Sequence, residues 1–204
     1  MNKNILTILT IVLAAISFTS CGDRIVVDIE RYVPYIPDDV TRGVVINGVR
    51  WATRNVGTPG TFADAPESFG SHFQWNRRTT LWADNWNGND AWEWARANDP
   101  CPQGWRVPTG TELNSLLNAV SRWITVNGVY GMLFGTTPHY IFLPAAGLRS
   151  AAGIINAAGI LGFYWSSSFD HWNGAGGLEL SHGGWGWGFS HHPSHGFSVR
   201  CVAQ

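Results

Sequence analysis

The sequence has 204 residues, of which 45% are hydrophobic and 13% are charged, and its formal net charge is −1. Because soluble domains typically contain about 25% charged residues, ion pairs contribute little here, and we expect aromatic packing and backbone hydrogen bonds to stabilise the fold. A nearly neutral chain favours neither nucleic acid nor an acidic surface as a partner.

The first 20 residues have the features of an export signal. Lys3 supplies a positive charge, Ile5–Phe18 is apolar, and the stretch Phe18-Thr19-Ser20-Cys21 is a small-residue cleavage site that ends in cysteine. Its resemblance to bacterial lipoprotein signals implies that Cys21 carries a lipid, which anchors the mature chain in the outer membrane or at the cell surface. The alternative is ordinary cleavage that leaves Cys21 as a spare thiol. The apolar stretch is shorter than the roughly 20 residues of a spanning helix.

One domain is expected to follow the signal. Residues 21–42 mix charged residues with prolines and show no sustained period, so we interpret them as a tether or arm. The domain is expected to cover residues 43–204, a length that suits a single core. Near its start, two short apolar runs meet at Asn47-Gly48, which is a strong signal for a β-hairpin.

The next part of the chain is rich in loops. Residues 58–78 predict a long packed loop that leads to a strand at Phe73–Trp75, and residues 81–98 contain four tryptophans with a short helix expected at Ala91–Ala97. The helix with the best sequence support is Thr109–Val120. Thr109 and Glu112 have the spacing of a capping box, and Leu113, Leu116, Leu117 and Val120 recur at helical spacing.

Short strands are predicted over most of the remaining chain. Their expected ranges are Val126–Tyr130, Gly131–Gly135, Tyr140–Pro144, Gly162–Ser166, Gly177–Ser181, Trp185–Ser190 and Phe197–Val202. Few helices, many short strands and long loops are typical of the α+β class.

Two cysteines remain if Cys21 is lipidated, namely Cys101 and Cys201. An exported chain meets oxidising conditions, and a bridge between these cysteines would close a loop of about 100 residues, which the chain-entropy treatment credits with roughly 4–5 kcal/mol. The alternative is a pair of unbonded, buried thiols.

The segment Tyr164–Cys201 has an unusual composition. It holds four of the 12 tryptophans and five of the seven histidines, dispersed among glycine, serine and asparagine. Rigid aromatic side chains with small adaptable neighbours are typical of binding surfaces. Within Gly184–Phe189 aromatic residues alternate with glycine, so that in a regular strand Trp185, Trp187 and Phe189 share one face. This face is either an exposed platform or part of the core.

Metal-dependent and catalytic chemistry find little support. The run 191–195 contains three histidines, but no cysteine pair or carboxylate lies nearby to complete a zinc site. Calcium needs six to eight oxygen ligands, and the segment offers only Asp170 and Glu179. Ser166–Ser168 lack the Gly-x-Ser-x-Gly elbow of hydrolases. We therefore expect neither an enzyme nor a metal or cofactor site.

Several fragments together carry a family resemblance. They are Trp51–Val56, Phe73–Trp75, Asp99–Thr109, Leu143–Gly147, Tyr164–Ser168 and Ser198–Cys201. In this order they resemble the Fibrobacter succinogenes major paralogous domain of exported lipoproteins. The resemblance implies a C-type-lectin-like fold with short antiparallel strands, one or two helices and long aromatic, Gly-rich loops. It also implies that Cys101 and Cys201 are disulfide partners.

The segment 163–200 is also similar to variable proteins of diversity-generating retroelements, in which two constant frames bracket exchangeable positions. The frames here are Trp165–Ser168 and Ser198–Cys201. The resemblance implies that the ligand-binding positions are Phe169, Asp170, His171, Trp172, Asn173, Ser181, His182, Trp185, Trp187, Phe189, Ser190, His191, His192, Ser194 and His195.

The function that this resemblance implies is adhesion. The expected partners are an external receptor protein or glycan, the membrane through the lipid, and pilus subunits. Two alternatives stay open, namely an accessory carbohydrate-binding module of a cell-surface glycan system and a structural envelope protein without a discrete ligand.

Overall fold

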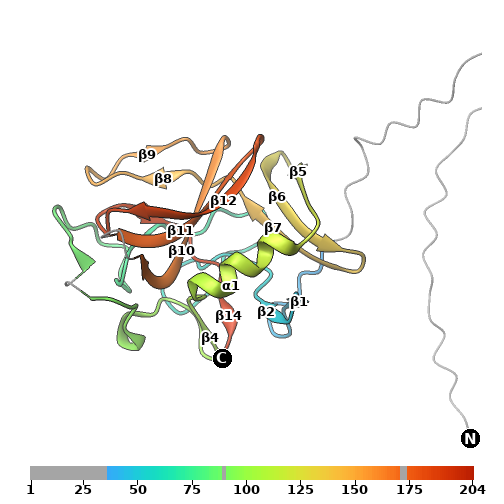
Figure 1. The fold of residues 1–204 in the computed structure, drawn as a ribbon, viewed down its shortest axis with the longest axis horizontal. Helices are drawn as coiled ribbons and strands as arrows, with labels where there is room; N and C mark the ends of the chain where they lie inside the picture. Colours follow the sequence, from blue (N-terminus) through green and yellow to red (C-terminus); the bar gives the residue numbers. More distant parts are fainter. Residues whose placement is uncertain (1–35, 89–90, 171–173) are drawn as a thin grey trace, which may run out of the picture. The chain divides into compact units, whose positions relative to one another are not determined.

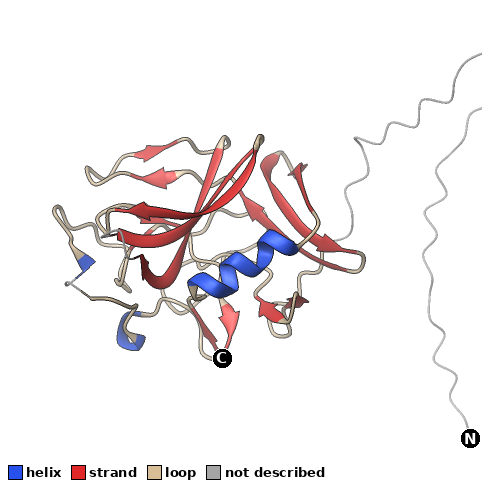
Figure 2. Cartoon of the chain, in the orientation of Figure 1, coloured by secondary structure: helices blue, strands red, loops and turns tan. Residues whose placement is uncertain are grey.

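The computed structural model describes residues 36–88, 91–170 and 174–204. Within these ranges the fold is mostly β, with one short α-helix and several antiparallel sheets (Figure 2), which is consistent with the α+β class expected from the sequence. In these same ranges, no helix combines the length and the apolar character that crossing a membrane requires. Cys21 and the expected signal peptide lie outside the described residues.

The strands are short apart from those of two hairpin sheets (Figure 1). They are β1 (Val44–Ile46), β2 (Val49–Trp51), β3 (Phe73–Gln74), β4 (Trp105–Arg106), β5 (Ser121–Val126), β6 (Val129–Thr136), β7 (His139–Pro144), β8 (Leu148–Arg149), β9 (Ile155–Asn156), β10 (Leu161–Asp170), β11 (Gly174–Ser181), β12 (Gly184–His191), β13 (Gly196–Phe197) and β14 (Val202–Ala203). The helical elements are α1 (Gly110–Ser115) and the 3₁₀ turns η3 (Arg96–Asn98) and η4 (Leu116–Asn118).

These strands form four sheets. Their strand orders are β1-β2-β14-β4, β3-β13-β8-β9, β5-β6-β7 and β10-β11-β12. The first sheet pairs the hairpin at the start of the domain with β14 at the end of the chain, since Val202 lies opposite both Trp51 and Arg106. The two ends of the domain are therefore joined through one sheet.

The compact part of the chain begins before residue 43, where the sequence suggested the boundary. Ile36 packs against the apolar cluster of Val126, Leu133 and Phe142. Two residues further on, the Asp38 carboxylate accepts two hydrogen bonds of 2.6 Å from the Arg54 guanidinium. The end of the expected tether is thus attached to the domain.

Local sequence signals account for the first hairpin and for the start of α1. Asn47 and Gly48 adopt φ angles of 48° and 81° between β1 and β2, as a two-residue hairpin turn requires. Thr109 accepts a hydrogen bond from the Glu112 amide, and the Glu112 side chain accepts one from the Thr109 amide, which completes the capping box.

Several predicted bounds are wrong. Regular α-helix ends at Ser115 rather than Val120, and of the predicted apolar stripe Leu113 and Leu116 are buried whereas Val120 is exposed. The strand predicted at Val126–Tyr130 is interrupted by a turn at Asn127-Gly128, so that Val126 ends β5 and Val129 and Tyr130 begin β6. At the positions predicted to form a helix, Ala91–Ala97, only the 3₁₀ turn η3 starts.

The sheet β10-β11-β12 lies between two apolar clusters. Phe163 and Trp165 belong to a cluster with Trp75, whereas Tyr164 and Leu178 belong to a second cluster with Leu113 and Leu116. Because alternate residues of β10 enter different clusters, this sheet is the centre of the fold. Helix α1 packs against β10 and β11 on the side of the second cluster (Figure 1).

A buried guanidinium, that of Arg200, holds the C-terminal residues in place. It donates hydrogen bonds to Asn55 Oδ1 at 3.0 Å, to the Thr53 carbonyl at 3.0 Å and to the Phe142 carbonyl at 2.9 Å. Burial lowers the pKa of Arg200 to about 10, so the group remains protonated at neutral pH. Among the described residues no carboxylate forms an ion pair with it. Carbonyl and amide oxygens therefore solvate this charge.

The expected disulfide is present. Cys101 and Cys201 are bonded with their Cα atoms 6.1 Å apart and with a sequence separation of 100. This bond attaches Cys201, the residue that follows Arg200, to the loop before β4.

We predict that Arg200→Met lowers the free energy of unfolding by about 3–5 kcal/mol, because several buried oxygens lose their donor. Urea denaturation followed by tryptophan fluorescence measures the effect. Arg122→Met is the matched control, since Arg122 is an exposed arginine of β5, and a change within about 0.5 kcal/mol is expected for it. Equal effects of both substitutions would contradict the structural role of Arg200.

Loss of the disulfide has a separate expected effect. Replacing Cys101 and Cys201 together by alanine should lower the free energy of unfolding by about 2–5 kcal/mol, because the unfolded chain is no longer closed into a long loop. Thermal unfolding of the wild-type chain with and without reductant provides the comparison. An unchanged unfolding temperature in reductant would show that the bridge does not stabilise the fold.

Candidate functional site

The predicted binding segment begins and ends at neighbouring positions in the core. The Trp165 amide donates to the Ser198 carbonyl at 3.1 Å, and the Ser198 amide donates to the Phe163 carbonyl at 3.0 Å. Trp165, Ser166, Ser198 and Arg200 are all fully buried. The two frames around the segment are therefore hydrogen-bonded to each other inside the fold, and β10, β11 and β12 extend from them as two successive hairpins (Figure 1).

The serines of the first frame have structural partners. The Ser166 hydroxyl donates to the Gly176 carbonyl at 2.9 Å, and its oxygen accepts a hydrogen bond of 3.2 Å from the Ser168 amide. Ser168 Oγ accepts a hydrogen bond of 2.9 Å from the amide of Gly110 at the start of α1. These hydroxyls hold β10 against β11 and α1.

The backbone of β12 is less regular than the sequence suggested. Trp185 lies opposite Leu180 and Trp187 opposite Leu178, but the ladder shifts before Phe189, which lies opposite Gly177. A one-residue irregularity of this kind is a β-bulge, which interrupts the alternation of a strand. The strict period of two expected from Trp185 to Phe189 therefore does not continue across Gly188.

For some of the predicted positions the structure describes only the backbone. Asp170 ends β10, and Trp185, Trp187, Phe189 and Ser190 belong to β12. His171, Trp172 and Asn173 lie outside the described residues.

The remaining positions have described side chains with diverse surroundings. His182 is exposed, and its ring lies edge-on to Trp123 with 6.3 Å between ring centroids. His192 is also exposed, and its Nδ1 lies 2.8 Å from the hydroxyl of the buried Ser194. Ser181 is half-buried and donates to the Gly184 carbonyl at 3.1 Å.

His191 and His195 belong to an aromatic cluster beneath the segment. The His191 ring lies 4.7 Å from that of Phe197, 5.7 Å from Phe163 and 6.2 Å from Trp165. Burial, with a further contribution from His195, lowers the pKa of His191 to about 4, and burial likewise lowers the pKa of His195. His191 is therefore neutral at pH 7 and contributes to packing at the base of the segment.

Phe169 connects the segment to an exposed indole that the sequence analysis did not single out. Its ring lies 5.3 Å from the buried Trp75 and 5.5 Å from Trp92, in both cases edge to face. The Trp92 side chain is 74% exposed, and the next residue, Glu93, forms a bridge with Ser168 on β10. The dense run of tryptophans at 82–94 was the only sequence signal for this contact, and it did not indicate which residue Trp92 would contact.

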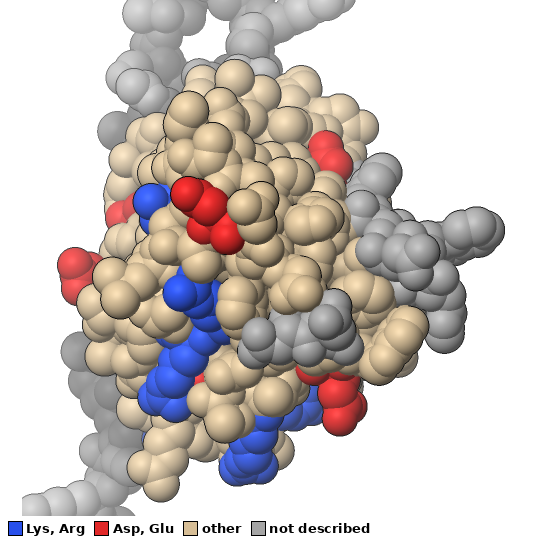
Figure 3. All heavy atoms as spheres, turned by 90° about the vertical axis from the view of Figure 1, so that its left-hand side faces the viewer, with Lys and Arg blue, Asp and Glu red and all other residues tan. Residues whose placement is uncertain are grey.

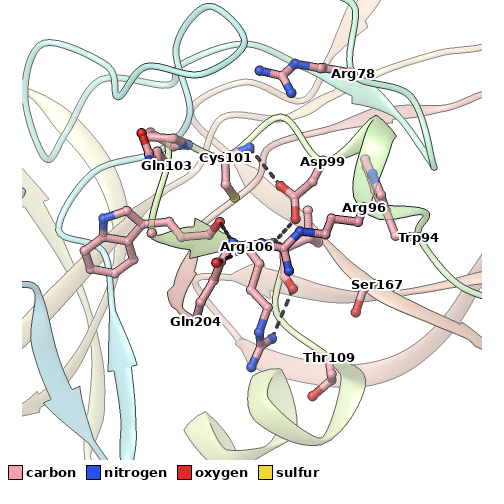
Figure 4. Close-up of a pocket in the computed structure, with 14 residues that line it drawn as sticks. Arg78, Trp94, Arg96, Asp99, Cys101, Gln103, Arg106, Thr109, Ser167 and Gln204 are labelled. Carbon is pink, nitrogen blue, oxygen red and sulfur yellow. Dashed lines mark hydrogen bonds between the residues drawn. The ribbon is translucent and has the colours of Figure 1, made fainter.

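A cleft that the sequence did not predict lies beside the disulfide. It is a cleft of about 540 Å³ (Figure 4). Its lining residues are Arg78, Trp94, Arg96, Asp99, Cys101, Pro102, Gln103, Gly104, Trp105, Arg106, Val107, Thr109, Ser167 and Gln204. Most of them belong to the stretch 99–109, for which the sequence indicated a family resemblance, a disulfide at Cys101 and a helix cap at Thr109, but no ligand site.

Within residues 36–88, 91–170 and 174–204, no group of three or more His, Cys, Asp or Glu side chains is placed to hold a metal ion. His191 and His195 instead contact aromatic rings.

Comparison with known proteins gives no further assignment: no family model, no curated protein and no solved structure matches the chain.

We predict that the free energy of unfolding falls by about 1–2 kcal/mol between pH 6.5 and pH 4.5, after allowance for solvent screening. The folded-state pKa of His191 lies near 4, below its ordinary value. The unfolded chain therefore takes up a proton in this range that the folded chain does not. Urea denaturation at both pH values measures the loss.

His191→Phe keeps an aromatic ring at this position but removes the titrating group, so it should reduce that pH dependence. His182→Phe is the control, because His182 is exposed, and it should keep the wild-type pH dependence. An equal loss of stability in the His191→Phe chain would contradict the assignment to His191.

Proposed function

We propose that this protein is an exported, lipid-anchored binding protein that presents its C-terminal segment to a ligand outside the cell. In this proposal the domain is C-type-lectin-like and related to the Fibrobacter succinogenes major paralogous domain. The ligand is a receptor protein or glycan, and binding involves no catalysis. Lipid on Cys21 keeps the domain at the cell surface.

The observation that carries this proposal is the closure of the segment at its base. The frames at Trp165 and Ser198 are buried and hydrogen-bonded to each other, and the disulfide at Cys201 follows closely. Residues between the frames can therefore differ in sequence without displacing the residues that support them. A display surface, whether its positions are diversified or constant, requires this separation.

Exposed groups beside and within the segment supply contact area. Trp92 is 74% exposed and rests on Phe169. His182 and His192, which precede and follow β12 in the sequence, are also exposed. Indoles are frequent among the residues that dominate binding energy at interfaces. A rigid ring held by a packed neighbour also loses little conformational entropy when a ligand binds.

Charge supports the same interpretation. Figure 3 shows a surface that is largely uncharged, with arginine side chains gathered in the lower half of the view and acidic groups dispersed. Such a surface provides little long-range attraction for a highly charged polymer. Recognition at the segment is therefore expected to depend on shape, ring contacts and hydrogen bonds.

We predict that Trp92→Ala weakens capture of the ligand about tenfold or more, the range of an interface hot spot, while stability changes little because the indole is exposed. The full-length chain, solubilised in detergent, is first tested against an array of glycans and of extracellular receptor domains. The affinity for the strongest hit is then measured for each variant.

Leu81→Ala is the matched control, because the Leu81 side chain is also 74% exposed but makes no ring contact with the segment. Its affinity should equal that of the wild type. If Trp92→Ala and a His182, His192 double alanine variant both bind as tightly as the wild type, the display role of this face is wrong.

A further inference from the structure

The cleft beside the disulfide has the properties of a second binding site that is separate from the displayed segment. Its volume of about 540 Å³ lies within the usual range for small-molecule pockets. In Figure 4, Arg78 lies at one end and Arg106, near Thr109 and the start of α1, at the other, with Asp99 and Arg96 between them. Its lining shares only Ser167 with the C-terminal frames.

The cleft is rich in guanidinium groups that are not neutralised. Arg106 is paired with Glu112 through two short hydrogen bonds. Arg96 donates to the neutral Gln204 side chain at 3.1 Å. Within the described part of the chain Arg78 forms no hydrogen bond and no ion pair. Two cationic groups in the cleft, Arg78 and Arg96, are thus available to an anion.

Arginine is the only cationic residue type of this domain, since Lys3 is the only lysine in the sequence. The planar guanidinium group binds carboxylates through paired N–H donors. It therefore selects a planar carboxylate by geometry as well as by charge. An acidic group of the ligand would be held at Arg78 or at Arg96, and the other guanidinium would donate to a hydroxyl oxygen of the same ligand.

The remaining lining groups suit a ligand with many hydroxyls. Asp99 accepts hydrogen bonds from the amides of Cys101 at 2.8 Å and Val107 at 3.0 Å, one on each oxygen. Each of these oxygens keeps an additional lone pair that can accept a hydroxyl proton. Gln103, Thr109 and Ser167 add donors and acceptors.

The part of the wall formed by residues 101–106 and Gln204 is rigid. The disulfide fixes Cys101, and Val202 and Ala203 of β14 pair with Arg106 and Trp105 of β4. The Gln204 backbone amide donates to the Gly104 carbonyl, and its side-chain amide donates to the Trp105 carbonyl, both at 3.1 Å. A preorganised wall loses little freedom when a ligand binds, which favours affinity.

We propose that this cleft binds a small acidic saccharide, of the hexuronic acid class. One of the two guanidiniums, Arg78 or Arg96, binds its carboxylate and the other donates to a hydroxyl oxygen, while Asp99 and the neighbouring amide and hydroxyl side chains bind the remaining hydroxyls. This site is additional to the displayed segment.

Isothermal titration calorimetry of the full-length chain in detergent tests the proposal with D-glucuronate as the probe. D-glucose is the neutral counterpart, and inorganic phosphate is the simple anion. We expect saturable binding of D-glucuronate, binding at least tenfold weaker for D-glucose and for phosphate, and weaker binding of D-glucuronate at high salt.

The variants Arg96→Gln and Arg78→Gln should each weaken binding of D-glucuronate about tenfold, because a charge-assisted hydrogen bond is lost. Arg122→Gln is the control, because Arg122 is exposed on β5 and does not line the cleft. Trp92→Ala should also bind D-glucuronate normally, which separates this site from the displayed segment.

The proposal is wrong if D-glucuronate gives no saturable heat, or if Arg96→Gln and Arg78→Gln bind it as the wild type does. Equal affinity for phosphate would overturn the assignment to a saccharide and leave a general anion site. Equal affinity for D-glucose would overturn the role of the two arginines.

Discussion

The rest of the structure depends on how the chain holds the charged side chain of Arg200 in its interior. The guanidinium bonds to Asn55 and Thr53, which follow β2, and to Phe142 on β7. A buried charge that lost these oxygens would be strongly unfavourable. The C-terminal frame can therefore occupy only one position relative to the first hairpin and to β7. Ser198 and Cys201 lie on either side of Arg200 and hold the frame in the same position. Ser198 is hydrogen-bonded to β10, and Cys201 forms the disulfide with Cys101.

This constraint divides the C-terminal segment into a base and a displayed part. At the base, Phe169 packs on Trp75, His191 packs on Phe197, and Ser194 is buried. Further out, His182 and His192 are exposed. Substitutions at the base change packing within the apolar cluster, whereas substitutions of the exposed histidines change what solvent or a ligand meets and remove one local contact each, to Trp123 from His182 and to Ser194 from His192. The positions that resemble an exchangeable set are therefore not physically equivalent.

Features that depend on neighbouring residues could be predicted from the sequence, and those that depend on distant ones could not. The turn at Asn47-Gly48 and the capping box of Thr109 and Glu112 are local and were predicted correctly. The turn at Asn127-Gly128 carries the same local signal, but apolar residues on both sides of it were taken for one strand. The contact between Trp92 and Phe169, like the cleft, joins segments far apart in the chain, and no periodicity reveals which loops meet. The disulfide was expected through family resemblance and a cysteine count, both of which are independent of periodicity.

The position of the cleft follows from the same division. One wall of the cleft consists of β4, the loop at Cys101 and the last residues of the chain, which are the elements that fix the C-terminal frame, and Arg78, Trp94 and Arg96 line the rest. A site made from these elements keeps its shape when residues of the displayed segment differ, because those residues reach the cleft only through Ser167 in the frame. The displayed segment and the cleft can therefore differ in specificity and change independently. Any chain that retains the buried arginine, the disulfide and the β4–β14 pairing retains the geometry of the cleft wall, whatever its exposed loops bind.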